Sequence, residues 1–184
     1  MKQLFGIPVF EDQVDVTKFD CIPLTPLEPT WDSGVSSTFS SQKQEEIPQE
    51  VWGYLSGIIE RNLHPAQLMG KNARFGHIWR NVYEKHDYQD AHIHPKSQWS
   101  YVIYVDVTSR TAFFNPSIHN IQNHFGCTLP QFPLDYKPEL GPGHIIKPTL
   151  EPGSIIIFPS FLMHMVNSGN EGTTISGNIY MEYS

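Results

Sequence analysis

The chain has 184 residues, 39% of them hydrophobic and 17% charged, a composition that predicts one globular domain with its own core. Its formal net charge is −7 and it has no run of lysine and arginine, so we expect no binding to nucleic acid or to an anionic membrane. The two cysteines, Cys21 and Cys127, are far apart and indicate free thiols, which predicts a cytoplasmic protein.

Residues 1–73 are expected to form an N-terminal extension with one strand, a loop and one helix. The opening MKQLFGIPVF is interrupted by Pro8 too early for a signal peptide, and no later stretch is apolar for the length of a transmembrane helix. Residues 5–10 predict a short strand, and residues 20–44 are rich in proline, serine and threonine, which indicates a loop. Apolar residues then recur at helical spacing over 48–63, so we predict a helix that packs across one sheet.

From Arg74 onward the pattern changes to short β-prone runs separated by proline, glycine and asparagine. With no helical pattern between them, these runs predict an all-β sandwich or jelly roll within a single domain of residues 1–184. The predicted strands of this core, residues 74–184, are 74–83, 91–94, 99–107, 111–116, 143–150, 154–158, 163–166 and 173–183.

The run DYQDAHIHPKSQWSYVIY contains the first chemical signal, His92 and His94. Residues at i and i+2 of a strand point to the same face, so both imidazoles can reach one point. Neutral imidazole is a common ligand of Fe(II), Zn(II) and Mn(II), but a chain with nine histidines can hold such a pair by chance. A third candidate, His164, follows FPSFLM at the start of a late strand, which a jelly roll brings close to an early one.

The longer context of these histidines resembles a known family. WRNVY, HIHPKSQWSYVIY, PGSIIIFPSFLMH and ISGNI together look like the 2-oxoglutarate/Fe(II)-dependent oxygenases of bacteria and marine phages. The resemblance covers residues 79–179, and it depends on the combination of H-x-H-P with F-P-S-x-x-x-H. It implies a double-stranded β-helix, a jelly roll with the helix in its N-terminal extension.

The resemblance also implies the site and the reaction. His92, His94 and His164 match the metal positions, Fe(II) and 2-oxoglutarate are the implied cofactors, and hydroxylation of a small molecule or peptide is the implied activity. For a phage-encoded member the compartment would be the host cytoplasm. Many oxygenases of the superfamily have Asp or Glu where His94 stands, so three neutral ligands would hold the metal here.

A second departure concerns the cosubstrate. Ten residues after the distal histidine, where the family usually has an arginine for the far carboxylate of 2-oxoglutarate, this chain has Thr174. A half-buried carboxylate favours a cation, and arginine is its best partner. Lys147 is our first candidate, because it lies in the half of the core that carries His164. Further candidates for cosubstrate binding are Arg110, Arg80, the phenol of Tyr104, and a polar face of the last strand that includes Thr174 and Asn178.

Two other function classes remain open at this point. A cupin-type metal enzyme that does not use 2-oxoglutarate shares the jelly roll and the H-x-H with a distant histidine. The missing arginine favours it, whereas Lys96 and Gln98 stand where many cupins have a glutamate. A non-catalytic jelly-roll module would also look similar, and a homodimer is plausible for such a fold. Loop histidines and aromatic residues that are secondary candidates for the site are His119, His124, Trp79, Tyr83, Trp99 and Phe114.

Overall fold

The computed structural model describes residues 2–4, 6–22, 27–29, 35–41, 43–117 and 145–183. Its helical elements are η1 (Val16–Phe19), η2 (Gln44–Glu46) and α1 (Gln49–Leu63). Its strands are β1 (Lys2–Leu4), β2 (Ile7–Gln13), β3 (Glu28–Pro29), β4 (Ser36–Ser37), β5 (Lys71–Tyr83), β6 (Gln89–His92), β7 (Trp99–Tyr104), β8 (Thr111–Phe114), β9 (Ile145–Ile146), β10 (Ser154–Pro159), β11 (His164–Val166) and β12 (Gly172–Glu182).

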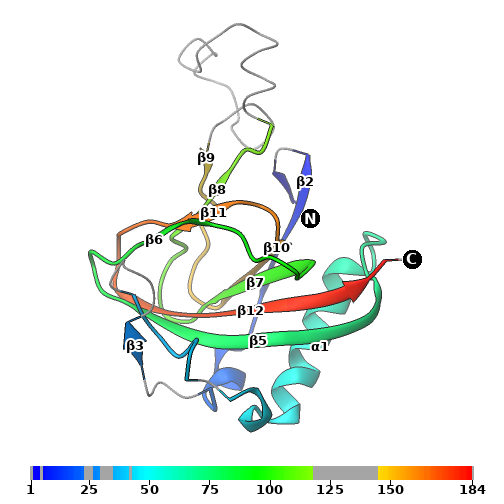
Figure 1. Ribbon diagram of the computed structural model, residues 1–184, viewed down its shortest axis with the longest axis horizontal. Helices are drawn as coiled ribbons and strands as arrows, with labels where there is room; N and C mark the ends of the chain where they lie inside the picture. The colour runs from blue at the N-terminus through cyan, green and yellow to red at the C-terminus, as the bar shows by residue number, and fades with distance from the viewer. Residues whose placement is uncertain are drawn as a thin grey trace, which may run out of the picture.

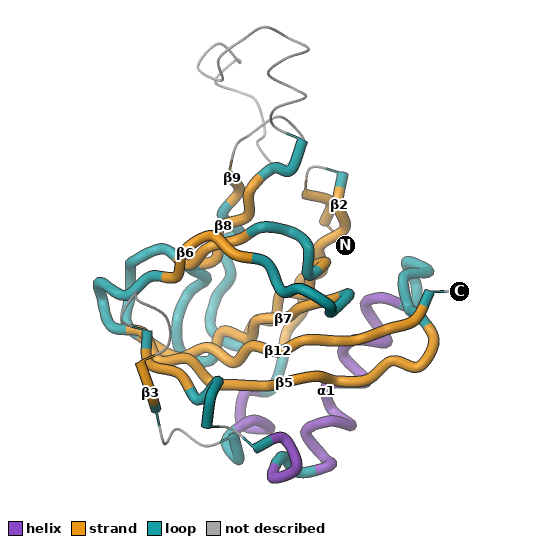
Figure 2. The backbone as a smooth tube through the Cα atoms, in the orientation of Figure 1, coloured by secondary structure: helices purple, strands orange, loops and turns teal. Residues whose placement is uncertain are grey.

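Two antiparallel sheets face each other (Figures 1 and 2). Within the described residues, the larger sheet has the order β1-β2-β10-β7-β12-β5-β4-β3, and the smaller one β6-β11-β8-β9. The four central strands β10, β7, β12 and β5 and the four strands of the smaller sheet make up the predicted jelly roll, which is confirmed. The N-terminal strands extend the larger sheet at both edges.

The outer face of the larger sheet packs against α1, as predicted (Figure 1). The helix contributes its buried stripe, which includes Leu55, Ile58 and Ile59. The sheet contributes alternate residues such as Ile103 and Ile175, which are fully buried in the same cluster. Burial of this continuous apolar layer is the main stabilising contribution to this half of the molecule.

The space between the two sheets is divided. At the β9 and β10 end it is filled by a second apolar cluster that includes Phe113, Ile156 and Phe158. Nearer β5, β6 and β12 it holds a cavity. The turn before β10 is tied to β7, because Gly153 donates its N–H to Tyr104 O at 2.7 Å. Gly153 has a φ of 85°, which favours glycine at this position.

Three local predictions differ from the structure. The strand predicted over 143–150 is shorter, because β9 covers Ile145–Ile146 and the described residues 147–150, which include Pro148, are not in a strand. Part of the predicted loop 20–44 forms β4, which pairs with β5 and so covers one edge of the sheet. The predicted strand 91–94 is shifted, because β6 ends at His92 and His94 lies in the following connection. Among the described residues, no helix is long and apolar enough to cross a bilayer.

Candidate metal centre and its cavity

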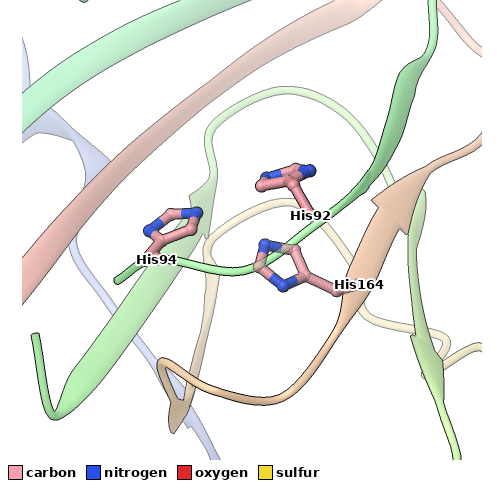
Figure 3. A group of neighbouring side chains, drawn as sticks. All are labelled: His92, His94 and His164. Atoms are coloured by element: carbon pink, nitrogen blue, oxygen red, sulfur yellow. The ribbon is translucent and has the colours of Figure 1, made fainter. Parts of the chain in front are cut away.

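Three histidines, two from the smaller sheet and one from the connection after β6, come together between the sheets (Figure 3). His164 begins β11 and is the cross-strand partner of His92 at the end of β6, so antiparallel pairing brings these two side by side. His94 follows two residues later. The ring centroids are 4.3 Å apart for His92 and His164, 5.4 Å for His92 and His94, and 5.1 Å for His94 and His164.

The Nδ1 atom of each ring lies against an oxygen that can only accept a hydrogen bond. His92 Nδ1 is 2.6 Å from Asp90 O, and His164 Nδ1 is 2.9 Å from Leu162 O, so each uses the carbonyl two residues earlier. His94 Nδ1 is 2.6 Å from Asn178 Oδ1. Each Nδ1 therefore carries the proton, and the Nε2 lone pair is left for a metal. One ring nitrogen from each of the three histidines lies within 4.8 Å of the other two.

Burial keeps the ligand form of these rings available. His164 is only 3% exposed, and burial, followed by the neighbouring His92 and His94, holds its pKa well below the ordinary value. Burial also lowers the pKa of His94, against the opposing effect of its hydrogen bond to Asn178. Both imidazoles are therefore neutral at pH 7, which is the state that binds a metal.

A chain of hydroxyl groups stands behind His94. Asn178 Oδ1 also accepts a hydrogen bond from Ser100 Oγ at 3.0 Å, which fixes the orientation of the amide. Ser100 Oγ is 2.8 Å from Ser160 Oγ, and Ser97 Oγ donates to Ser160 Oγ at 2.9 Å. Sequence reasoning did not single out these serines, although Ser97 follows the H-x-H-P motif and Ser160 ends F-P-S. The closeness of Ser97 and Ser160 to these motifs could have identified them as candidates.

The histidines open into a cavity of about 560 Å³, a size typical of a small-molecule site. The larger sheet supplies one wall through β5, β7 and β12, and the smaller sheet supplies the other through β6, β8 and β11. The described residues that line it are Phe39, Trp79, Asn81, Tyr83, Gln89, Asp90, His92, Ile93, His94, Pro95, Val102, Tyr104, Arg110, Thr111, His164, Val166, Thr174, Ser176 and Asn178.

Among these lining residues, Arg110 is the one arginine or lysine. It is 7% exposed, its guanidinium lies 4.9 Å from the centre of the Tyr83 ring, and burial lowers its pKa without removing its charge. No described carboxylate forms an ion pair with it. It donates instead to backbone carbonyls of two loops, those of Asn167 (2.6 Å), Asn170 (2.9 Å), Glu84 (3.5 Å) and Asp87. These contacts leave one of its five N–H donors without an acceptor among the described residues.

The other predicted cosubstrate residues separate into two groups. Tyr104 and Thr174 line the cavity near Arg110: Tyr104 Oη donates to Thr111 Oγ1 at 2.8 Å, and Thr174 Oγ1 accepts from Asn81 Nδ2 at 3.3 Å. Burial raises the pKa of Tyr104 to about 12, so its phenol stays protonated. Lys147, by contrast, is exposed just after β9 and is not among the lining residues.

The remaining candidates are also distributed on both sides of the sheet. Arg80 is buried on the opposite face of β5 and donates to Phe19 O at 2.9 Å. Trp79 and Tyr83 line the cavity, whereas Trp99 is part of the outer core and Phe114 is not a lining residue. His119 and His124 lie outside the described residues.

Comparisons with known proteins agree with this geometry. A family profile described as "Putative 2OG-Fe(II) oxygenase" matches residues 77–181. The chain is similar to HygX from Streptomyces hygroscopicus with nickel and 2-oxoglutarate bound (TM-score 0.59, 9% identity, covering 96% of this chain and 84% of that chain). It is also similar to the viral collagen prolyl hydroxylase of Paramecium Bursaria Chlorella virus-1 (0.55, 10%, 95% and 96%) and to a Pseudomonas putida prolyl-4-hydroxylase (0.54, 12%, 96% and 94%). No curated protein sequence matches the chain. At these identities the likeness to solved structures shows a shared fold.

Proposed function

The chain belongs to the 2OG-Fe(II) oxygenase family, and from this premise we propose that Nε2 of His92, His94 and His164 holds the Fe(II) of an oxygenase that uses 2-oxoglutarate. The observation that carries the assignment is the direction of the three rings. Each Nδ1 lies against a carbonyl oxygen, which leaves the Nε2 atom of each ring for a metal.

The donor set fits the metal. Imidazole nitrogen is a good ligand for Fe(II), and three protein ligands leave positions open for small molecules. Non-haem Fe(II) oxygenases more often combine two histidines with a carboxylate. Here His94 stands in place of the carboxylate, and Asn178 fixes its ring as second-sphere partners of metal ligands generally do.

Arg110 is the residue we assign to the far carboxylate of 2-oxoglutarate. It is a buried cation that forms no ion pair with a described carboxylate, and it lines the same cavity as Tyr104 and Thr174. A buried cation whose hydrogen bonds go only to backbone carbonyls favours a ligand of opposite sign. The cation that is missing at Thr174 is thus supplied from the start of β8, which removes the reason for preferring an enzyme that does not use 2-oxoglutarate.

When bound, Fe(II) and 2-oxoglutarate supply the oxidation of a C–H bond by O₂, with succinate and CO₂ as coproducts. The chain's own residues bind and orient. The three histidines fix the metal, Asn178 holds one of them in its tautomer, and Arg110 anchors the cosubstrate at the inner end of the cavity. Because that end is lined by buried residues, it also limits the access of water.

The substrate does not follow from the likeness to other structures. HygX and the two prolyl hydroxylases share this fold at 9 to 12% identity. We propose a small molecule or a peptide, since the cavity is open at one end and has the volume for a side chain or a small metabolite.

An anaerobic titration tests the metal and cosubstrate together. Fe(II) and then 2-oxoglutarate are added to the metal-free protein while the visible absorption spectrum is recorded. We expect a metal-to-ligand charge-transfer band only when both are present, and its loss in His164→Ala. The control is His86→Ala, which removes an exposed histidine that does not line the cavity. Metal binding without the band would contradict the use of 2-oxoglutarate.

A second titration tests whether Arg110 binds the far carboxylate of 2-oxoglutarate. We compare 2-oxoglutarate with 2-oxobutyrate, which lacks the far carboxylate, in the wild type, Arg110→Met and Lys147→Met. The wild type and Lys147→Met should prefer 2-oxoglutarate, and Arg110→Met should lose most of that preference, about 10-fold or more for a charge-assisted hydrogen bond. Arg110→Lys, which keeps the charge, should retain part of it. Loss of preference in Lys147→Met instead would move the anchor to Lys147.

Location and assembly stay predictions. An exposed free Cys21 and a net charge of −7 support a cytoplasmic protein that does not bind nucleic acid, and we propose a single domain. A homodimer is a proposal that a sedimentation experiment can test directly.

A further inference from the structure

The entrance of the cavity differs in chemistry from its interior. Of the described lining residues, four are exposed, and they mark the side that is open to solvent. Three are apolar: Phe39, which is 39% exposed, Ile93, which is 44% exposed, and Pro95. The fourth is Asp90, the only carboxylate of the described lining. A ligand that enters thus meets an apolar rim with a single negative charge.

Asp90 is held in place without being neutralised. Its backbone carbonyl accepts the hydrogen bond from His92 Nδ1 at 2.6 Å, so its position is tied to a proposed metal ligand. Its carboxylate has no described hydrogen-bond or ion-pair partner, and no described lysine or arginine belongs to the exposed part of the lining. The net charge of −7 adds a field that attracts cations toward such an entrance.

Trp79 indicates independently that this cavity binds a molecule with a hydrogen-bond acceptor. Its side chain lines the cavity and is 4% exposed, yet its indole Nε1–H has no hydrogen-bond acceptor among the described residues. The ring lies next to the entrance and the metal site, 5.0 Å from the Phe39 ring and 5.9 Å from the His94 ring, measured between centroids. Buried indole N–H groups nearly always have an acceptor, so a bound molecule that carries an oxygen would complete this one.

We propose that the primary substrate is a cation, an aliphatic amine or guanidine that also carries a carbonyl or hydroxyl oxygen. Asp90 pairs with its positive charge, the rings of Phe39 and Trp79 pack against its apolar stem, and Trp79 Nε1–H donates to its oxygen. The inference rests on the proposed function only in taking this cavity as the active site. Specificity at the entrance then comes from one carboxylate and one indole.

The expected selectivity is modest because Asp90 is exposed. An exposed ion pair together with contact between a cation and an aromatic face gives roughly a 3- to 30-fold preference over a neutral molecule of the same shape. Salt should weaken this preference, since the interaction is near the surface.

Two probes of nearly equal shape measure the preference: N-acetyl-lysine N-methylamide, which is a cation, and N-acetyl-2-aminoheptanoic acid N-methylamide, whose pentyl side chain is neutral. Each is titrated into the full-length, metal-free chain while the indole N–H resonances are followed by NMR, with Trp79→Phe identifying the resonance of Trp79. We expect the lysine probe to bind more tightly and to shift that resonance. Asp90→Asn should reduce the preference to what the aromatic rings alone contribute, and Glu151→Gln, which removes an exposed charge outside the cavity, should leave it unchanged.

The outcomes separate this inference from the proposed function, because the titration needs no iron. Equal affinity for the two probes, or an unchanged preference in Asp90→Asn, overturns the cationic substrate even if the charge-transfer band appears. A preference that is reduced in Asp90→Asn supports it even if that band does not appear. Tight binding that leaves the Trp79 resonance unmoved overturns the role of the indole.

Discussion

The two faces of β12 have different roles. Ile175 and Ile179 point to the outer face and are buried in the cluster that contains α1, whereas Thr174, Ser176 and Asn178 point inward and line the cavity. Successive side chains of a strand alternate between faces, so apolar packing and polar chemistry share one backbone. The outer face should therefore determine stability, and the inner face should determine what the protein binds.

The largest expected effect comes from the outer face. Ile175→Ala removes a fully buried side chain from the α1 cluster and should lower the free energy of unfolding by about 2–5 kcal/mol, as measured by urea denaturation. The affinity for Fe(II) should change little in the folded protein. Ser176→Ala, its neighbour on the inner face, should cost about 1 kcal/mol because it removes one hydrogen bond from Asn81. If Ile175→Ala and Ser176→Ala lowered the free energy of unfolding equally, the outer face of β12 would not determine stability more than the inner face.

A second change tests how tightly the outer face is packed. A Cβ at Gly177 would clash with Tyr101 Oη, in a core where the phenol has no described hydrogen-bond partner. Gly177→Ala should therefore destabilise the protein by about 1–3 kcal/mol through overpacking. Tyr101→Phe removes a buried, unpaired hydroxyl and should restore part of that loss in the double variant. If the double variant is no more stable than Gly177→Ala, the contact with the hydroxyl is not the cause.

The same division explains what the sequence could predict. The helix over 48–63 and the strands could be predicted because apolar periodicity records packing directly. The histidine trio was a prediction from motif context, and the structure brings the three rings together. Arg110 could not be ranked above Lys147, because both follow or precede short strands and only the tertiary fold shows which one lines the cavity. The serine chain behind His94 depends on contacts of β7 with β12 and with Ser160, just after β10, and no local pattern encodes these contacts.

On the inner face, Asn178 is expected to control metal affinity more than stability. Asn178→Ala removes the acceptor for His94 Nδ1, so the ring can rotate or change its tautomer. We expect the affinity for Zn(II) or Fe(II), measured by calorimetry, to fall about 10- to 100-fold, which is the usual effect of losing such a partner.

Two variants make the Asn178 result specific. Asn178→Asp keeps an acceptor oxygen and should retain most of the metal affinity. Asn72→Ala removes an exposed asparagine that bonds Glu182 away from the cavity and should have no effect. In NMR spectra of the metal-free protein, His94 should lose its Nδ1–H tautomer in Asn178→Ala only. Retention of that tautomer in Asn178→Ala would show that Asn178 does not hold the ring.

The smallest expected effect is the loss of stability of the metal-free protein in acid. The slope of its free energy of unfolding against pH distinguishes the two faces of β12. Burial is the main cause that lowers the pKa of His94 and holds that of His164 well below the ordinary value of about 6.5. Between the lowered and the ordinary pKa the unfolded chain binds more protons than the folded one, so stability rises with pH. The contribution is complete above about pH 6.5 and is lost as the pH falls through the folded-state values. Urea denaturation in the presence of a chelator should show this loss as the pH falls below about 6.5, with a shallower slope in His164→Gln. Ile175→Ala should lower the whole curve and leave its slope unchanged, because no proton is bound on that part of the outer face; a changed slope in Ile175→Ala would mean that the two faces of β12 are coupled.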